Sequence, residues 1–597
     1  MMEFIAAHFV PLLFAGLLLF LLTGFPVAFS LAATGLFFGY LGMEAGLFPA
    51  TLFQALPLRI FGIMQNDTLL AIPFFTLMGI ILERSGMAED LLETVGQLFG
   101  PVRGGLALAV VFVGALLAAT TGVVAASVMA MGLISLPIML RYDYHRPIAT
   151  GVIVASGTLA QAVPPSLVLI VMADQLGRSV GDMYSGALLP AFLTVLLYAA
   201  FVIVIAFVKP TWVPALPPEA RTLREADGAS GHRSLLVLLT VCVAGAVIWG
   251  QFHGAILNPM LGREGDAPLD ERIVAALTFG ALLSILFASL NRLLKLGLLS
   301  RLAERVVFVM IPPLVLIFLV LGTIFLGLAT PTEGGALGAI GALIMALARR
   351  RMTLPLLKEA LEATARLSTF VLFILIGATV FSFTFNAADG HVFVEGLFKN
   401  IPGGALGFLL IVNLLVFVLG MFIDFFEIAF IVVPLLAPVA EKMGIDLIWF
   451  GVILAFNLQT SFLTPPFGFA LFYLRSIAAK TDYIDTVTGK RIAAVTTAEI
   501  YRGAVAFIAL QLVIVGLLVV QPELVMGGLE KKQAVDLESI QIEVAPNDYG
   551  QPEENPAQDE RETRSQTEDG PRDQSKSQEE DPAAALLEEL AKEKKNQ

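Results

Sequence analysis

Two pairs of adjacent prolines stand inside long apolar runs of this sequence, and neutral oxygen-bearing side chains precede each pair. The first run is "ASGTLAQAVPPSLVLIVMA", residues 155–173, and the second is "FNLQTSFLTPPFGFALFYL", residues 456–474. Hydroxyl and amide oxygens are hard, uncharged ligands, which suit a weakly held alkali cation. The chemistry indicated is ion binding, and the candidate ligands are Ser156, Gly157, Thr158, Asn457 and Thr460.

The prolines predict that the helix is broken at both places, at Pro164 and Pro165 and again at Pro465 and Pro466. Proline has no backbone N–H, so it frees carbonyl groups that lipid cannot satisfy. Such a break is tolerated where it lines protein or a water-filled cavity. The alternative is a simple proline kink whose free carbonyls are capped by serine and threonine. Two breaks at matching positions favour the ion-binding interpretation.

Composition places the chain among polytopic membrane proteins. Hydrophobic residues make up 57% and charged residues 15% of the sequence, and the mean hydropathy is +0.83. One cysteine, Cys242, excludes an intrachain disulfide and a thiolate metal cluster, and we find neither HExxH nor GxxxxGK[ST]. No cofactor, no nucleic-acid partner and no bound ATP are expected. The net charge of −13 falls mostly in the tail at 530–597, which is expected to be disordered.

Apolar segments of about 20 residues, the length that spans a bilayer, recur along residues 1–529. The segments 105–140 and 405–440 are too long for one span and contain no charged turn that would divide them. Cytoplasmic loops carry an excess of Lys and Arg. Placing the basic loops 84–103, 141–147, 209–233, 292–305, 349–366 and 478–502 on the cytoplasmic side requires both long segments to enter and leave on one side. They are therefore predicted to be re-entrant hairpins.

An internal repeat relates the two halves. A shift of 301 positions superposes Pro137 on Pro438 and the first proline pair on the second. The loop charges put the two hairpins on opposite sides, so the repeat is expected to be inverted. The predicted organisation is a first repeat at 1–208 with a hairpin at 105–140 and a broken helix at 148–173, a linker with two extra membrane helices at 209–305, and a second repeat at 306–529 with a hairpin at 405–440 and a broken helix at 447–477.

The hairpin tips are candidate solute-binding surfaces. In the first tip, Thr120, Thr121 and Gly122 form a small-residue turn whose backbone amides could meet an anion. In the second, Asp424 lies at membrane depth, where an ionisable residue is by default a functional candidate. Glu333 in "ATPTEGG" is expected to be a helix-start carboxylate instead.

The motifs "LAIPFFTLMG", "PVRGGLALA", "VPPSLVLI", "ATPTEGGALGA" and "FLTPPFGFALFYL" resemble the large permease subunit, of DctM type, of the tripartite ATP-independent periplasmic (TRAP) transporters. The resemblance covers roughly 1–210 and 306–525. The two extra apolar segments, a polar stretch at 478–497 and "IDFFEIAFIVVP" are more similar to the mannitol/chloroaromatic subtype. The first tip reads "ATTGVVAA" in place of the glycine- and serine-rich tips typical of the family.

The resemblance implies an inner-membrane, multi-pass elevator-type transporter that imports an organic acid with sodium as the coupling ion. It implies a small DctQ-type membrane subunit and a periplasmic DctP-type binding protein as partners. It adds Thr464 to the ion region and Gly420 to the second tip. Two alternatives remain: a stand-alone sodium–carboxylate symporter, and an intramembrane enzyme. A single tip aspartate without a matching partner argues against the enzyme.

Overall fold

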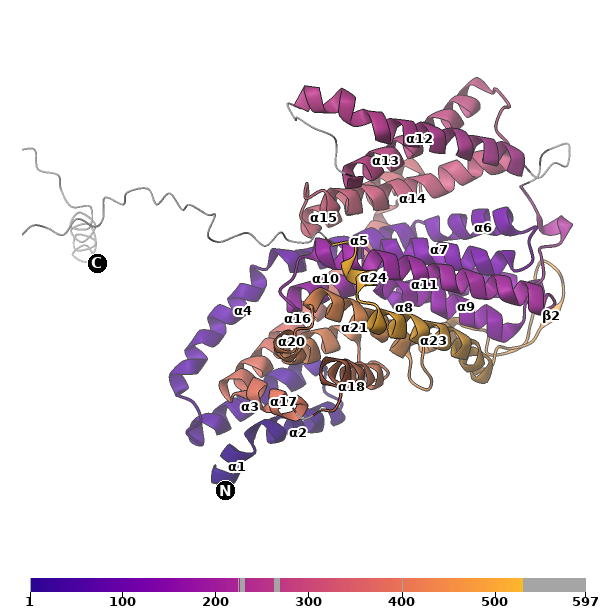
Figure 1. Ribbon diagram of the computed structural model, residues 1–597. Coiled ribbons are helices and arrows are strands. Elements are labelled where there is room, and N and C mark those ends of the chain that lie inside the picture. The colour runs from indigo at the N-terminus through magenta and orange to yellow at the C-terminus, as the bar shows by residue number, and fades with distance from the viewer. Residues whose placement is uncertain (1, 224, 226–230, 262–268, 400, 530–597) are drawn as a thin grey trace, which may run out of the picture. The chain divides into compact units, whose positions relative to one another are not determined.

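The computed structural model describes residues 2–223, 225, 231–261, 269–399 and 401–529 (Figure 1). Thr120 and Thr121 are described by their backbone alone, and the acidic tail lies outside the described residues. Within the described part, nine helices are long and apolar enough to cross a membrane, or up to ten if a bent pair at Ala50–Met64 and Asp67–Arg84 counts as one span. The predicted class, a helical polytopic membrane protein, is thus confirmed, with one short pair of strands besides the helices.

The first half of the chain contains eleven α-helices, with short 3-10 turns between some of them. In order they are α1 (Met2–Ala7), α2 (Phe9–Leu22), α3 (Val27–Glu44), η1 (Ala50–Ala55), α4 (Leu56–Met64), η2 (Asp67–Leu70), α5 (Ala71–Arg84), α6 (Met87–Phe99), α7 (Gly105–Thr121), α8 (Val124–Arg141), α9 (Arg146–Thr158), η3 (Leu159–Gln161), α10 (Leu167–Gln175) and α11 (Val180–Val208). The connecting segment holds η4 (Pro218–Ala220) and the two extra helices α12 (His232–Leu261) and α13 (Leu269–Leu294).

The second half repeats this order with one polar insertion. Its elements are α14 (Arg301–Phe325), α15 (Pro331–Ala348), α16 (Leu354–Ala387), α17 (Gly390–Phe398), α18 (Gly404–Leu419), α19 (Phe425–Glu427), the π-helical turn η5 (Ile428–Val432), α20 (Val433–Lys442), α21 (Leu447–Phe462), α22 (Phe469–Ile477), β1 (Tyr483–Ile484), β2 (Arg491–Ile492), α23 (Thr497–Val520) and α24 (Glu523–Met526).

Helix positions repeat at almost the spacing that the sequence predicts. Helices α9 and α21 begin at Arg146 and Leu447, again 301 positions apart. Helices α7 and α18 both start after a glycine in the left-handed region, Gly104 at φ 78° and Gly403 at φ 95°. Helices α3 and α15 have 18 residues each. The starts of these helices therefore recur at nearly the spacing of the prolines.

The two repeats exchange packing partners. Helix α3 of the first repeat packs against α16 of the second, and α15 of the second packs against α5 of the first. Small residues allow these close crossings: a Cβ added at Gly35 would lie 2.7 Å from the carbonyl oxygen of Val380, and one added at Gly338 would lie 2.6 Å from Met78 Sδ. A swapped arrangement makes the two repeats one folding unit.

The basic loops gather at one end of the helices. Arg349 and Arg351 both pair with Asp90 on α6, at 3.0 and 3.1 Å, and Arg305 pairs with Glu93 at 2.7 Å. Backbone bonds join the same region, from the amide of Gly104 to the carbonyl of Val213 and from the amide of Leu216 to the carbonyl of Gly100. Loops that the charge bias assigns to one side of the membrane therefore meet in the structure, which supports that assignment. We call this surface the basic end.

Each long apolar segment folds back on itself, and the two do so from opposite ends. The first consists of α7 and α8, and a Cβ added at Gly114 on α7 would lie 3.2 Å from Met131 Sδ on α8. Both of its outer ends lie at the basic end. Helix α16 starts there and runs for 34 residues, about 50 Å, to Ala387. Helix α17 follows the end of α16, and its Glu395 pairs with Lys442 at the end of α20 at 2.5 Å. The outer end of the second hairpin therefore lies at the end of the helices opposite the basic end.

The second hairpin differs from the first in its returning arm. After Gly420 the chain forms α19, the π-helical turn η5 and then α20, in place of one straight helix. These pieces pack against α10 and α17, and η5 also contacts α16. In the first repeat the corresponding arm, α8, packs against α22. Each returning arm thus contacts the second part of the other repeat's broken helix.

The extra helices form a pair of their own. Helices α12 and α13 pack against one another and against α14, at one side of the molecule (Figure 1). Only 17% of the most apolar window of α12 and 11% of that of α13 are buried. Their remaining apolar surface is suited to lipid or to a membrane partner.

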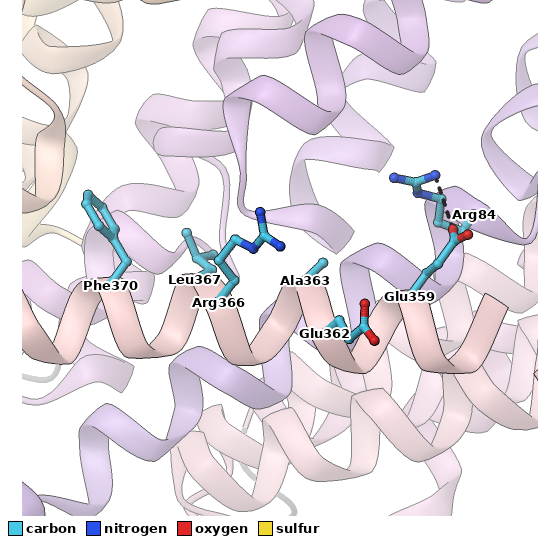
Figure 2. A pocket seen from close by; sticks show the side chains of 7 residues that line it. All are labelled: Arg84, Glu359, Glu362, Ala363, Arg366, Leu367 and Phe370. Carbon is cyan, nitrogen blue, oxygen red and sulfur yellow. Dashed lines mark ion pairs between the residues drawn. The ribbon is translucent and has the colours of Figure 1, made fainter. Parts of the chain in front are cut away.

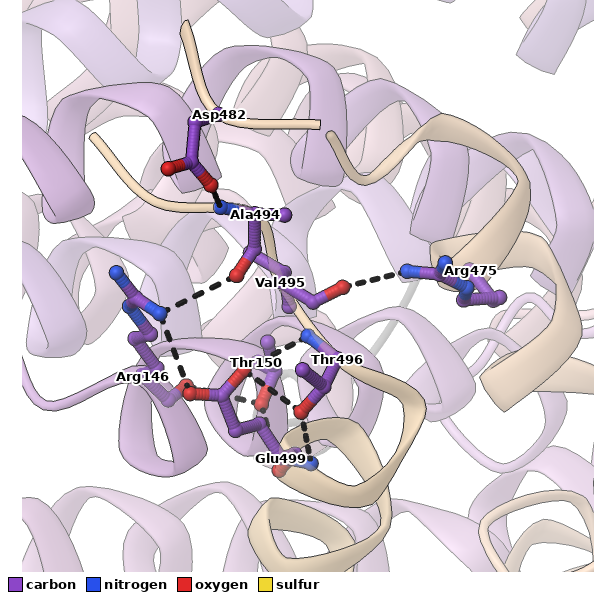
Figure 3. Close-up of polar contacts among 8 residues, drawn as sticks. All are labelled: Arg146, Thr150, Arg475, Asp482, Ala494, Val495, Thr496 and Glu499. Carbon is purple, nitrogen blue, oxygen red and sulfur yellow. Dashed lines mark hydrogen bonds and ion pairs between the residues drawn. The ribbon is translucent and has the colours of Figure 1, made fainter. Parts of the chain in front are cut away.

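The polar insertion docks on the turn between α8 and α9. Its two short strands pair antiparallel, Tyr483 with Ile492. Figure 3 shows Arg146 donating to the carbonyl oxygen of Ala494 at 3.2 Å and Arg475 donating to that of Val495 at 2.5 Å. Asp485, which is 4% exposed, binds Arg141 at 2.9 Å. The insertion therefore fastens the α22–α23 connection of the second repeat to the first.

Asp485 should hold this insertion in place. Hydrogen bonds from Thr488 and from Arg141 lower the pKa of Asp485 from 3.8 to about 2. Because the pKa falls on folding, the stabilisation is present above about pH 4 and is lost as the pH falls toward 2. At neutral pH, Asp485→Asn should raise tryptic cleavage at Lys490 and Arg491 roughly 5-fold, which corresponds to about one lost hydrogen bond.

The matched control is Asp143→Asn. Asp143 also pairs with the insertion, through Lys490 at 3.0 Å, but its side chain is 75% exposed. Exposed pairs contribute little, so this variant should be cleaved like the wild type. Equal cleavage of the Asp485 and Asp143 variants would show that the buried pair does not fasten the insertion.

Candidate functional site

The first helix break lies between α9 and α10 and is held by its own polar groups. Pro164 and Pro165, joined by a cis peptide bond, occupy the gap after η3. Ser166 caps α10: its hydroxyl accepts from the amide of Val168 at 3.2 Å and donates to the carbonyl oxygen of Gln161 at 2.6 Å. A carbonyl left free by the break is thereby satisfied.

The second break, between α21 and α22, is built in the same way from different residues. Pro465 and Pro466 are also joined by a cis peptide bond. Tyr501 of α23 donates its hydroxyl to the carbonyl oxygen of Pro466 at 2.9 Å, and the amide of Gly468 donates to the carbonyl oxygen of Thr464 at 2.9 Å. Both proline pairs therefore break a helix as predicted. Pro164 and Pro165 are buried, whereas Pro466 is exposed.

Equivalent residues lie before the two breaks and contact the first arm of their own hairpin. A Cβ added at Gly114 on α7 would lie 2.5 Å from the Cβ of Ser156. In the second repeat, Asn457 donates through Nδ2 to the carbonyl oxygen of Asn413 on α18 at 2.6 Å. Ser156 is fully buried and Asn457 is 2% exposed. The pairs Ser156–Gly114 and Asn457–Asn413 occupy matching places in the repeat.

Two buried oxygens in these pairs have no hydrogen-bond partner within the described residues, Ser156 Oγ and Asn413 Oδ1. A buried polar atom without a partner is costly, which points to a ligand or water at that place. The predicted residues Thr158 and Thr460 instead donate to carbonyl oxygens on their own helix, at 2.8 and 3.1 Å, and Thr464, just past α21, donates to the carbonyl oxygen of Thr460 at 2.8 Å. A donating hydroxyl keeps its lone pairs and can still bind a cation.

Gln161 belongs to the same region, although its side chain was not singled out in the sequence. It lies in η3, is fully buried, and neither atom of its side-chain amide has a partner among the described residues. Turn η3 packs against α7, the first arm of the first hairpin, and against α21, the helix that precedes the second break. The only sequence signal is its position three residues before Pro164.

The hairpin tips lie close to the breaks. Gly122 ends α7 with φ 60°, and a Cβ added there would lie 3.0 Å from Leu167 Cγ at the start of α10. A Cβ added at Gly420 would lie 2.8 Å from the Cβ of Ser461, just before the second break. Gly157 faces Val128 of α8. The tips and the proposed ion ligands are thus brought together within each repeat.

Asp424 has a structural partner at the second tip. Its carboxylate accepts from the amide of Phe425 at 2.7 Å, while Glu427 accepts from the amide of Asp424 at 3.3 Å, which completes a capping box at the start of α19. Asp-x-x-Glu is a sequence signature for this cap. The carboxylate therefore helps to shape the tip, whatever else it binds.

Comparison with known proteins identifies a family and several relatives that match most of the chain. The model of the family described as "Tripartite ATP-independent periplasmic transporter, DctM component" matches residues 14–524. The "C4-dicarboxylate TRAP transporter large permease protein DctM" of Pseudomonas aeruginosa is 27% identical over 432 residues, 72% of this chain and 82% of that protein. The "Sialic acid TRAP transporter large permease protein SiaM" of Vibrio cholerae is 26% identical over 459 residues, 76% and 87% of the two chains.

Among solved structures, the YdaH transporter of Alcanivorax borkumensis aligns with 79% of this chain and 88% of its own, at a TM-score of 0.47 and 14% identity, which is too weak to identify the fold. The family match covers most of the chain and includes both breaks and both hairpins. This chain therefore belongs to the tripartite ATP-independent periplasmic transporters as a DctM component, the large permease, and is a multi-pass protein of the bacterial inner membrane.

Proposed function

We propose that this chain is the membrane subunit that carries an organic acid inward by sodium symport, in a complex with a small membrane subunit and a periplasmic binding protein. Its role is transport, as in the permease family to which it belongs. The relatives named above are described as transporters of a C4-dicarboxylate and of sialic acid, both of them organic acids. An elevator motion of the hairpins and broken helices is part of the proposal.

The observation that carries the proposal is the pair of matching sites beside the two breaks. Inverted-repeat transporters place coupling ions where interrupted helices expose backbone carbonyls. Ser156 Oγ, Asn413 Oδ1 and the side-chain amide of Gln161 are buried oxygen-bearing groups without a partner among the described residues. Neutral oxygens favour a cation that binds weakly and leaves again, as a coupling ion must.

Ser156→Ala and Asn457→Ala should each raise the sodium concentration needed for half-maximal uptake on the order of tenfold, because each removes one neutral oxygen worth about 1–2 kcal/mol. The measurement is uptake against sodium concentration in liposomes that hold the purified complex. Ser284→Ala is the matched control, since Ser284 is a buried serine on α13 whose hydroxyl donates to Ala281.

The control should keep the wild-type sodium dependence. Thermal midpoints of all three variants show whether any loss reflects unfolding. An unchanged sodium dependence in both the Ser156 and the Asn457 variants would remove the ion assignment. The stand-alone symporter is the second candidate function, and uptake by liposomes that hold only this chain would separate it from the tripartite one.

A further inference from the structure

Two adjoining cavities lead from the polar start of α16 to the tip of the first hairpin. The outer cavity, of about 550 Å³, is lined by Arg84 of α5 and by one side of α16, as Figure 2 shows. The inner cavity, of about 240 Å³, reaches Val123 and Ala125 at the start of α8. Arg84, Ala363 and Leu367 line both cavities, so the two adjoin, and we call them together the passage.

The inner end of the passage can bind an anion. Helix α8 has 18 residues and begins after Val123, whose side chain cannot cap it. The amides of its first turn therefore carry a partial positive charge that faces the cavity. Thr76 also lines the inner cavity; it is 1% exposed, and its hydroxyl has no partner within the described residues. Backbone amides and a free hydroxyl are the donors that a carboxylate or sulfonate group needs.

Charges along the passage are unevenly paired. Arg84 pairs with Glu359 at 3.6 Å, and Glu362 pairs with Lys358 at 3.7 Å. Arg366 forms no ion pair with any residue that the structure describes. Figure 2 shows its side chain leaving α16 on the side that faces Arg84. Beyond Arg366, α16 carries no charged residue as far as Ala387, so this arginine is the innermost charge of the helix.

Glu83 opposes an anion here, since this acidic residue also lines the inner cavity. Entry of an anion thus depends on a cation that is free to offset Glu83. The charge of Arg84 is offset by Glu359 at 3.6 Å, whereas Arg366 has no such partner among the described residues. A free charge at the mouth of a low-dielectric passage raises the local concentration of ions of opposite sign.

We propose that Arg366 gives this passage its preference for negative over positive charge, and so favours the movement of an organic oxyanion along it. The inference rests on the proposed function, because the transported acid is the oxyanion concerned. The charge preference itself is a property of the passage, so it can be measured without any transported solute.

The test uses the single cysteine of the chain. In a Cys242→Ala background, Ala125→Cys places one thiol at the inner end of the passage. Its reaction rates are measured with an anionic and a cationic methanethiosulfonate, ethylsulfonate and ethyltrimethylammonium, on the purified full-length chain. The ratio of the two rates cancels changes in thiol reactivity. Arg366→Gln should lower the anion-to-cation ratio about 5-fold, the effect of one charge at this range in a partly solvated site.

Lys358→Gln is the matched control, because Lys358 is a cation on the same helix that does not line the passage. The anion-to-cation rate ratio of this variant should stay within about 2-fold of that of the parent, since the charge of Lys358 is exposed and screened. A ratio that Arg366→Gln leaves unchanged would overturn the role of Arg366, and a thiol that reacts with neither reagent would overturn the passage. If Arg366→Gln lowers the anion-to-cation labelling ratio as expected but the wild-type complex shows no sodium-driven uptake, the result would count against the proposed function alone.

Discussion

Liposomes that contain only this chain should take up almost no solute when a sodium gradient is applied. Capture of a dilute acid requires a closed cleft. Apart from the nine-residue helix α17, the described segments at the end opposite the basic loops include short connections such as 176–179, 326–330 and 443–446. The longer polar insertion at 478–497 is occupied in binding the α8–α9 turn. The chain by itself therefore offers no described element for capture outside the membrane.

Adding the small subunit and the binding protein should raise uptake on the order of 100-fold, because a docked binding protein supplies solute at a high effective concentration. Succinate and N-acetylneuraminate are suitable first solutes, given the relatives described as transporters of a C4-dicarboxylate and of sialic acid. Liposomes without a sodium gradient are the control. Uptake by the chain alone that equals uptake by the full set would favour the stand-alone symporter.

Much of the fold could be predicted because its strongest signals are local. A proline pair removes two backbone donors wherever it stands, so both breaks were predictable from the sequence alone. The bounds of α21 and α22, Leu447–Phe462 and Phe469–Ile477, fill the broken helix predicted at 447–477. Glu333 was expected to start a helix, and it forms a capping box with Thr330. The excess of basic residues in certain loops likewise predicted that these loops meet.

The candidate site was less predictable because it depends on partners far away in the chain. Ser156 was proposed from its type and place, whereas the free amide of Gln161 can be recognised only once its surroundings are known. Docking of the insertion rests on Asp485 and Arg141, 344 positions apart. The capping role of Asp424 follows from the local pattern that it forms with Glu427. Its depth in the membrane suggested a solute-binding role for the same residue instead.

Gly503→Ala should destabilise the protein, although alanine is normally the better helix residue. Gly503 lies where α23 of the second repeat crosses α9 of the first, and a Cβ added there would lie 2.1 Å from the carbonyl oxygen of Pro147. Backbone atoms cannot move aside cheaply, so the helices must separate. The expected cost is roughly 3 kcal/mol, the upper range for overpacking a tight contact. The measurement is the thermal midpoint of the purified protein in detergent.

Gly516→Ala on the same helix is the matched control, since a Cβ added there meets nothing within 4 Å. This variant gains helix propensity, up to about 1 kcal/mol, and should melt at the same or a higher temperature. The two substitutions are chemically identical and should act in opposite directions. Because α9 ends at Thr158, just before the first break, separation of the helices should also weaken sodium dependence in Gly503→Ala. Equal midpoints for the two variants would show that the crossing is looser than the structure has it.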